Sequence, residues 1–99
     1  MNYITVVRGK LKGYPADAKK AHDATVEQLS VMTRPMGAVG HRPHLNPQDP
    51  SEFLAIDTWN NIEGLQKFMS DPQVAAAFGE LFEGMPDVSV WAESDWASF

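Results

Sequence analysis

The stretch FLAIDTWNN, residues 53–61, decides how the rest of the chain is interpreted. Its first seven residues are aromatic, aliphatic or β-branched apart from Asp57, a composition typical of a buried strand. Asn60 follows directly, with Glu63 three residues later, and the two resemble a capping box at the start of a helix. The stretch therefore predicts a strand that runs straight into a helix.

Strands and helices alternate along the whole chain. The predicted strands cover residues 2–10, 38–45, 53–59 and 87–96. Between Pro15 and Met32 the apolar residues recur every three or four positions, which predicts a helix with proline in its first turn. A second helical segment follows Asn60, restarts at Asp71-Pro72 and is terminated by Gly84.

The second predicted strand is the weakest of the four. It contains Gly40 and Pro43, and proline has no N–H to donate to a neighbouring strand. We therefore expect this strand at an edge of the sheet. The polar segment 46–52 is the turn that leads into residues 53–59.

The element order is β-α-β-β-α-β, and residues 1–99 are expected to form a single domain. Right-handed crossovers predict a ferredoxin-like α+β fold, a four-stranded antiparallel sheet with the helices on one face. In residues 53–59 both alternating sets of side chains are largely apolar, so the uncovered face also needs burial. A homodimer packed sheet to sheet is the simplest solution. The aromatic tail is expected to pack on that partner; its aromatic residues are Trp91, Trp96 and Phe99.

Composition excludes several classes of protein and partner. The net charge is −5 and no basic block exists, so neither nucleic acid nor an anionic membrane surface is an expected partner. The absence of cysteine excludes disulfides and thiol nucleophiles. The chain contains no run of about 18 apolar residues that could span a bilayer. Residues 1–12 lack the pattern of a signal peptide, so a cytoplasmic location is expected.

Asp57 carries the sharpest chemical signal, because a carboxylate on a buried strand is costly unless it is paired. A hairpin between the second and third strands would bring His41 near Asp57. Such a pair could act as a general base toward a phenolic or enolic proton. The alternative is a buried polar pair that only fixes the hairpin.

The other two histidines are weaker candidates. His22 lies on the apolar stripe of the first helix, where it either points into a pocket or is a satisfied, partly buried side chain. His41 and His44 are three residues apart and would face opposite sides of a strand, so a shared metal ion is not expected.

A set of apolar side chains could fill the core or line a cavity that suits a flat aromatic ligand. These side chains are Trp59, Phe68, Met69, Phe78 and Phe82. Arg8, Arg34 and Arg42 could bind an acidic ligand, although each is more typical of a surface or an interface.

Residues 53–78 resemble the antibiotic biosynthesis monooxygenase domain, which is a dimeric α+β barrel, and the likeness extends over nearly the whole chain. The matching features are an apolar strand, an acidic residue two before Trp59, the helical segment IEGLQKFMSDP, and a second helix with a phenylalanine. The resemblance implies a pocket between sheet and helices. The residues that would face it are Tyr3, Thr5, Val7, Asp57 and Trp59.

The chain departs from this family at positions where some members carry polar or ligating groups. Several members have a histidine in the helix after the tryptophan, and the matching residue here is Phe68. Haem-degrading members have polar or ligating side chains at the positions of Val7, Phe68 and Phe78. These departures argue against haem degradation.

The resemblance implies a cofactor-independent monooxygenase acting on a small aromatic or quinol-like compound, with no metal and no cofactor. The catalytic residues would be His41 and Asp57. The expected ligand-binding residues are His22, Trp59, Tyr3, Phe68 and Phe78. The alternative is a non-catalytic homodimer that binds a small ligand or is structural, and the missing helical histidine favours it.

Overall fold

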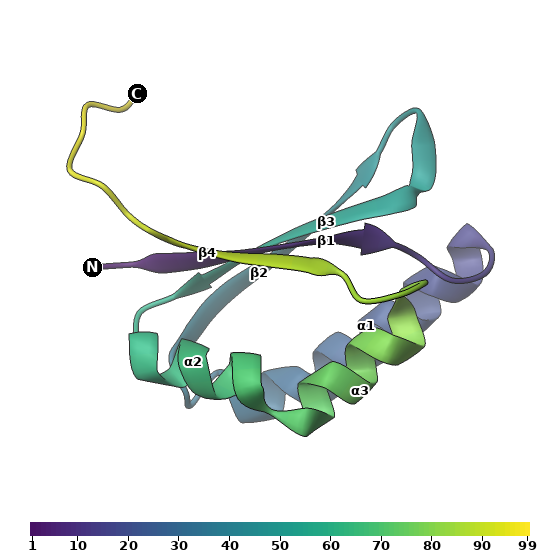
Figure 1. Cartoon of the computed structure of the whole chain (residues 1–99), viewed down its shortest axis with the longest axis horizontal. Helices are drawn as coiled ribbons and strands as arrows, with labels where there is room; N and C mark the ends of the chain where they lie inside the picture. Colours follow the sequence, from purple (N-terminus) through teal and green to yellow (C-terminus); the bar gives the residue numbers. More distant parts are fainter.

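The computed structural model describes all 99 residues and arranges them in two layers (Figure 1). One layer is an antiparallel sheet of β1 (Tyr3–Lys10), β2 (Ala38–Asn46), β3 (Asp49–Trp59) and β4 (Asp87–Ala92). The other contains the helices α1 (Pro15–Thr33), α2 (Ile62–Ser70) and α3 (Pro72–Leu81) on one face of the sheet. The strand order β2-β3-β1-β4 is that of the predicted ferredoxin-like α+β fold. None of the three helices has the length and apolar character needed to cross a membrane.

The edge position of β2 agrees with the prediction from Gly40 and Pro43. The hairpin with β3 is longer than predicted, because pairing continues as far as Asn46 and Asp49. Only residues 47–48 form the turn, so the predicted turn over 46–52 is wrong. The hairpin projects beyond the helices (Figure 1), and paired backbone there needs no apolar side chains.

The start of α2 lies one residue later than the sequence predicts. Asn61, not Asn60, is the N-cap, and its side chain accepts hydrogen bonds from the N–H groups of Glu63 and Gly64. Asn60 is held in the preceding turn, because its N–H donates to the Gly37 carbonyl. The cap therefore depends on a contact with a segment distant in sequence.

The end of α3 also differs from the prediction, because the helix stops at Leu81 rather than Gly84. Phe82 is extended and forms an isolated bridge with Leu11. Its ring packs so closely on Gly9 that a Cβ there would lie 2.8 Å from a ring carbon. Burying this large aromatic side chain stabilises the protein more than another turn of helix would.

The two remaining element ends follow simple rules. Asp71 caps α3 as predicted, since its carboxylate accepts from the N–H of Gln73 and Pro72 occupies the first turn. β4 ends at Ala92 rather than at residue 96, because Ala92 pairs with Tyr3, the first residue of β1. The partner strand simply ends there.

Two hydrophobic clusters fill the space between the sheet and the helices. The first contains Val7, Leu11, Ala18, Phe53, Ala55, Leu81 and Phe82. The second contains Trp59, Leu65, Phe68 and Val74. Phe78 packs against both. Met69 was expected to lie with these apolar side chains but is 41% exposed. It follows Phe68 directly, and successive side chains of a helix point about 100° apart.

The opposite face of the sheet carries no helix (Figure 1). On it lie the half-buried Ile4 and Val6 of β1 and Leu54 and Ile56 of β3. The chain after β4 extends away from the sheet, and Trp96 there is 83% exposed. The sheet is thus apolar on both faces, as predicted, but covered on only one.

Candidate functional site

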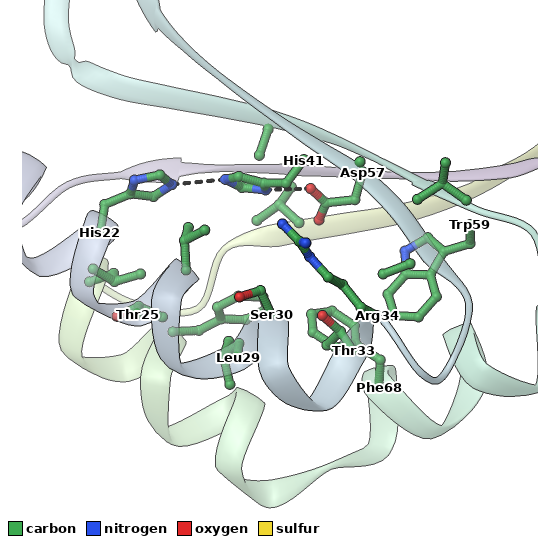
Figure 2. A pocket seen from close by; sticks show the side chains of 18 of the residues that line it. His22, Thr25, Leu29, Ser30, Thr33, Arg34, His41, Asp57, Trp59 and Phe68 are labelled. Atoms are coloured by element: carbon green, nitrogen blue, oxygen red, sulfur yellow. Dashed lines mark hydrogen bonds and ion pairs between the residues drawn. The ribbon is translucent and has the colours of Figure 1, made fainter.

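A cavity of about 260 Å³ lies between α1 and the sheet and is lined by twenty residues, twelve of them hydrophobic. Aromatic side chains of α2 and α3 close its inner end. Its polar lining side chains are His22, Thr25, Ser30, Thr33, Arg34, His41 and Asp57 (Figure 2). Apolar walls with a few polar groups are the usual composition of a small-molecule site.

The register of the β2–β3 hairpin pairs His41 with Asp57. His41 Nδ1 lies 2.5 Å from Asp57 Oδ1. The hydroxyl of Thr5, a fully buried residue, lies 3.4 Å from the other carboxylate oxygen and donates to it. The predicted proximity of His41 and Asp57 is therefore present, and both carboxylate oxygens have a hydrogen-bond partner.

His22 reaches the same pair from α1. Its Nε2 lies 2.9 Å from His41 Nε2, and its Nδ1 lies 3.0 Å from Asp23 Oδ1. The two imidazole rings stack with centroids 5.1 Å apart, and His22 also packs against Phe53 at 5.4 Å. The two histidines thus connect Asp57 in the cavity with Asp23 at the surface (Figure 2 shows the inner part of this chain).

Asp23 forms the outer end of this chain of contacts. It accepts a hydrogen bond from Lys19 at 2.7 Å in addition to its contact with His22. The Lys19 hydrogen bond, and after it that of His22, holds the pKa of the Asp23 carboxyl below its usual range. Asp23 therefore has two hydrogen-bond partners at once, one on each carboxylate oxygen.

The three imidazole contacts determine how many protons the histidines share. Two neutral imidazoles carry only two N–H protons. Three N–H protons are needed for the hydrogen bond to Asp57, the one between the two Nε2 atoms and the one to Asp23. When all three hydrogen bonds are formed, the two histidines together carry one positive charge. Without the third proton one of these contacts cannot be a hydrogen bond, whereas Asp23 still accepts from Lys19 through its other oxygen. The three contacts thus join two histidines and two carboxylates beside an apolar cavity.

Trp59 forms part of the inner wall. It is 1% exposed, and its ring lies 5.2 Å from that of Phe68. Phe68 in turn meets Phe78 edge to face at 6.4 Å. The Trp59 indole N–H is buried and has no hydrogen-bond partner. Buried indole N–H groups normally find a partner, so this donor is available to a bound molecule.

The cavity brings together all of the sequence-predicted site residues except Tyr3. Those that line it are His22, His41, Asp57, Trp59, Phe68 and Phe78. Tyr3 is on the same sheet face but packs against the cluster around Trp59 instead. Of the other β1 residues expected to face the pocket, Val7 lines it, and Thr5 touches it only through Asp57.

Sequence reasoning gave too little weight to Arg34. This residue is the C-cap of α1, and Figure 2 shows its side chain directed along the cavity toward His41 and Asp57. A signal was present, because His22, Val26, Ser30 and Arg34 follow one another at intervals of four, which places them on one helix face. From the sequence alone, Arg34 was named only as one of three arginines that could bind an acidic ligand, each more typical of a surface or an interface.

No group of three or more His, Cys, Asp or Glu side chains is placed to hold a metal ion. His44 pairs with Leu54 and so lies on the opposite face of β2 from His41. The site is an apolar cavity with a His–His–Asp chain of contacts along one wall.

Comparisons with known proteins bear on the fold. Neither a protein-family model nor a curated protein matches the sequence. Among solved structures, SnoaB, a cofactor-independent oxygenase from Streptomyces nogalater, is 15% identical with a TM-score of 0.73, over 96% of this chain and 95% of that chain. A Bordetella bronchiseptica protein whose name assigns it to the antibiotic biosynthesis monooxygenases is 17% identical with a TM-score of 0.72, over 94% and 97% of the two chains. Rv0793 from Mycobacterium tuberculosis is 20% identical with a TM-score of 0.67, over 99% and 100%.

These likenesses span essentially the whole chain on both sides of each comparison. At such identities they establish the fold and not the chemistry. The predicted antibiotic biosynthesis monooxygenase-like fold is confirmed.

Proposed function

We propose that this protein is a cofactor-independent monooxygenase that deprotonates and oxidises a small aromatic or quinol-like compound. The cavity between α1 and the sheet is its active site. The observation that carries the proposal is the 2.5 Å contact between His41 and Asp57 at the wall of an apolar cavity. The similarity in fold to SnoaB, a cofactor-independent oxygenase, supports it.

The base in this reaction is the His22–His41 pair in its uncharged state. A phenolic substrate transfers its proton to His41 Nε2 once the contact of that nitrogen with His22 opens, and the Asp57 carboxylate stabilises the imidazolium that forms. The apolar walls keep water away from the phenolate.

Oxygen then reacts with the substrate anion. The phenolate shares its charge with a ring carbon, which forms a bond to one atom of O₂. The peroxide takes the proton back from the imidazolium. The hydroperoxide loses water as the O–O bond breaks and the ring carbon releases its hydrogen. The products are a quinone and water, so the four electrons lost by the phenol all go to O₂ and no other reductant is needed.

The functional unit in this proposal is a homodimer. Its support is the uncovered sheet face of Ile4, Val6, Leu54 and Ile56, together with the exposed aromatic tail. Burying such a face against a second copy removes apolar surface that the helices leave in water. Sedimentation at micromolar concentration should show a dimer, and a monomer would contradict this part of the proposal.

Oxygen uptake is the direct test of the enzyme. Wild-type protein should consume O₂ with at least one member of a panel of hydroquinone, 2,5-dihydroxybenzoate, 1-naphthol and 1,4-dihydroxynaphthalene, each corrected for its protein-free rate. His41→Ala should lose about 100-fold or more of that rate. His44→Gln alters a histidine on the opposite face of the same strand and should keep the rate. Equal rates for wild type and His41→Ala would contradict the assignment of His41 to the catalytic base.

A second candidate function is ligand binding without turnover. One observation favours it, namely that both ring nitrogens of His41 are already engaged, by Asp57 and His22. A base in this state must release a partner before it accepts a substrate proton. Binding of panel compounds without oxygen uptake by wild-type protein would support this second function over the first.

A further inference from the structure

We propose that the cavity selects an aromatic carboxylic acid of one or two rings, whose carboxylate binds the Arg34 guanidinium and the Trp59 indole N–H. The inference rests on the proposed function in using the same cavity, and it deepens that function by naming the substrate class. Binding alone tests it, with or without turnover.

The first observation is the unpaired indole N–H of Trp59. The residue is 1% exposed and lines the cavity, and this N–H has no hydrogen-bond partner. Figure 2 shows the indole nitrogen on the side of the ring that faces Arg34 and Asp57. A buried donor without a partner costs free energy, and a ligand oxygen at this point would remove that cost.

The second observation is Arg34. Its guanidinium forms no ion pair with any carboxylate within 4.0 Å, although its side chain lies along the cavity wall. Figure 2 shows the guanidinium on the cavity side, below His41 and Asp57. A guanidinium presents a planar fork of N–H donors that matches the two oxygens of a carboxylate. Two donors without a partner in the protein therefore line the same cavity.

The charges that line the cavity are compatible with an anionic ligand. The whole chain has a net charge of −5. Asp57, the acidic residue of the lining, is already bonded to His41 and Thr5. Arg34 offsets its charge, so the lining is neutral when the histidines are neutral and positive when they hold the extra proton. A ligand without a hydrogen-bond acceptor would leave the N–H groups of Arg34 and Trp59 without a partner.

The size and walls of the cavity indicate the rest of the ligand. An apolar cavity of about 150 Å³ accepts benzene, so about 260 Å³ suits one or two rings. The walls include the rings of Phe53, Phe68, Phe78 and Phe82. The Arg34 guanidinium lies below His41 and Asp57 in Figure 2, so a carboxylate bound to it would hold the ring of the ligand close to the histidines.

Titration calorimetry of matched acids and esters tests the proposal. The probes are benzoate, 2,5-dihydroxybenzoate and 1-naphthoate, each compared with its methyl ester. Wild-type protein should bind at least one acid about tenfold or more tighter than the ester, the effect expected of charged hydrogen bonds. Arg34→Gln should remove the preference, and Arg34→Lys should keep part of it.

Two controls test whether the loss of acid preference in Arg34→Gln comes from a general change in charge or from a change in folding. Lys20→Gln removes the same charge from an exposed position on α1 outside the cavity and should leave the preference unchanged. Thermal melting of Arg34→Gln should match that of the wild type, since Arg34 is exposed and makes no ion pair.

The Trp59 indole ¹H–¹⁵N resonance, assigned with Trp59→Phe, provides a second readout. It should move downfield on addition of the acid and less on addition of the ester, while the exposed Trp96 resonance stays in place. Equal binding of acid and ester, a preference that survives Arg34→Gln, or no binding of any probe would each overturn the proposal. Acid-selective binding without oxygen uptake would contradict only the oxygenase. Uptake of oxygen with neutral quinols and no preference for acids would contradict only the present inference.

Discussion

The helical layer consists of two halves of equal length that bury different numbers of side chains. α1 has 19 residues and buries two, Ala18 and Thr33. α2 with nine residues and α3 with ten match that length and bury five. The five are Gly64, Leu65, Phe68, Val74 and Leu81. The α2–α3 half packs on the sheet, whereas α1 forms the outer wall of a cavity.

This difference separates stability from chemistry. Apolar burial is the main favourable term in folding, so the α2–α3 half should contribute most of the stability of the helical layer. A cavity costs stability, because its lining lacks packing partners. The cost falls on α1, whose side chains toward the sheet include His22, Ser30 and Arg34. Substitutions in the two halves should therefore have different consequences.

Truncation of an aromatic side chain at the end of α3 should have the largest effect. Phe82→Ala should lower the free energy of unfolding by about 3–5 kcal/mol, because Phe82 is 2% exposed and contacts Gly9. Leu29→Ala on the cavity face of α1 should cost about 1 kcal/mol, since Leu29 is only half-buried. Urea unfolding measures both. Equal losses would mean that α1 contributes to the core as much as α3 does.

Two glycines in the α2–α3 half make a matched pair. A Cβ at Gly64 would overlap the carbonyl oxygen of Met36, whereas a Cβ at Gly79 would meet nothing within 4 Å. Gly64→Ala should therefore destabilise the protein by roughly 2–3 kcal/mol. Gly79→Ala should stabilise it by about 0.5–1 kcal/mol, because alanine is the better helix former. The same urea series tests both, and a neutral Gly64→Ala would show that α2 is loosely placed.

Changes to the histidines on the α1 side should affect protonation more than stability. His22→Gln should cost no more than about 1 kcal/mol of unfolding free energy, the net value of a typical hydrogen bond. Ring ¹⁵N spectra of the wild type should show both Nδ1 atoms protonated and one proton shared by the two Nε2 atoms while the pair is charged. In His22→Gln the shared-proton signal of His41 should be absent. Its persistence would contradict the contact between the two histidines.

The smallest effect is expected at the surface end of the histidine chain. Hydrogen bonds from Lys19 and then His22 lower the pKa of Asp23. A carboxyl whose pKa is lowered by folding stabilises the protein at pH values above its pKa in the unfolded state. This stabilisation is lost as the pH falls through its pKa in the folded state. Because Asp23 is exposed, solvent screens most of the contribution. Asp23→Asn should melt slightly below wild type at neutral pH and approach it in acid, where the wild-type carboxyl is protonated, which a pH series of melting temperatures would show.

Much of the architecture could be predicted because its signals are local. Pro43 cannot donate in a ladder, so β2 lies at an edge. Asp71-Pro72 separates α2 from α3 by cap chemistry that needs no partner. The contact between His41 and Asp57 could also be predicted, because the two strands form a hairpin and its register brings these two residues together. These features depend on neighbours in the sequence.

Other features depended on contacts between distant segments. Phe82 leaves α3 because its ring packs on Gly9, and Asn60 is not a cap because its N–H bonds to Gly37. Neither partner is visible in the local pattern.

By itself, the sequence determined the order of the elements, the two-sided apolar sheet and the pairing of His41 with Asp57. Only the tertiary structure decided that His22 completes a chain of histidines, that Trp59 keeps an unpaired N–H and that Arg34 enters the cavity. The physical reason is that backbone preferences and periodicity act over a few residues. The distance between α1 and the sheet is instead set by how all the side chains between them pack.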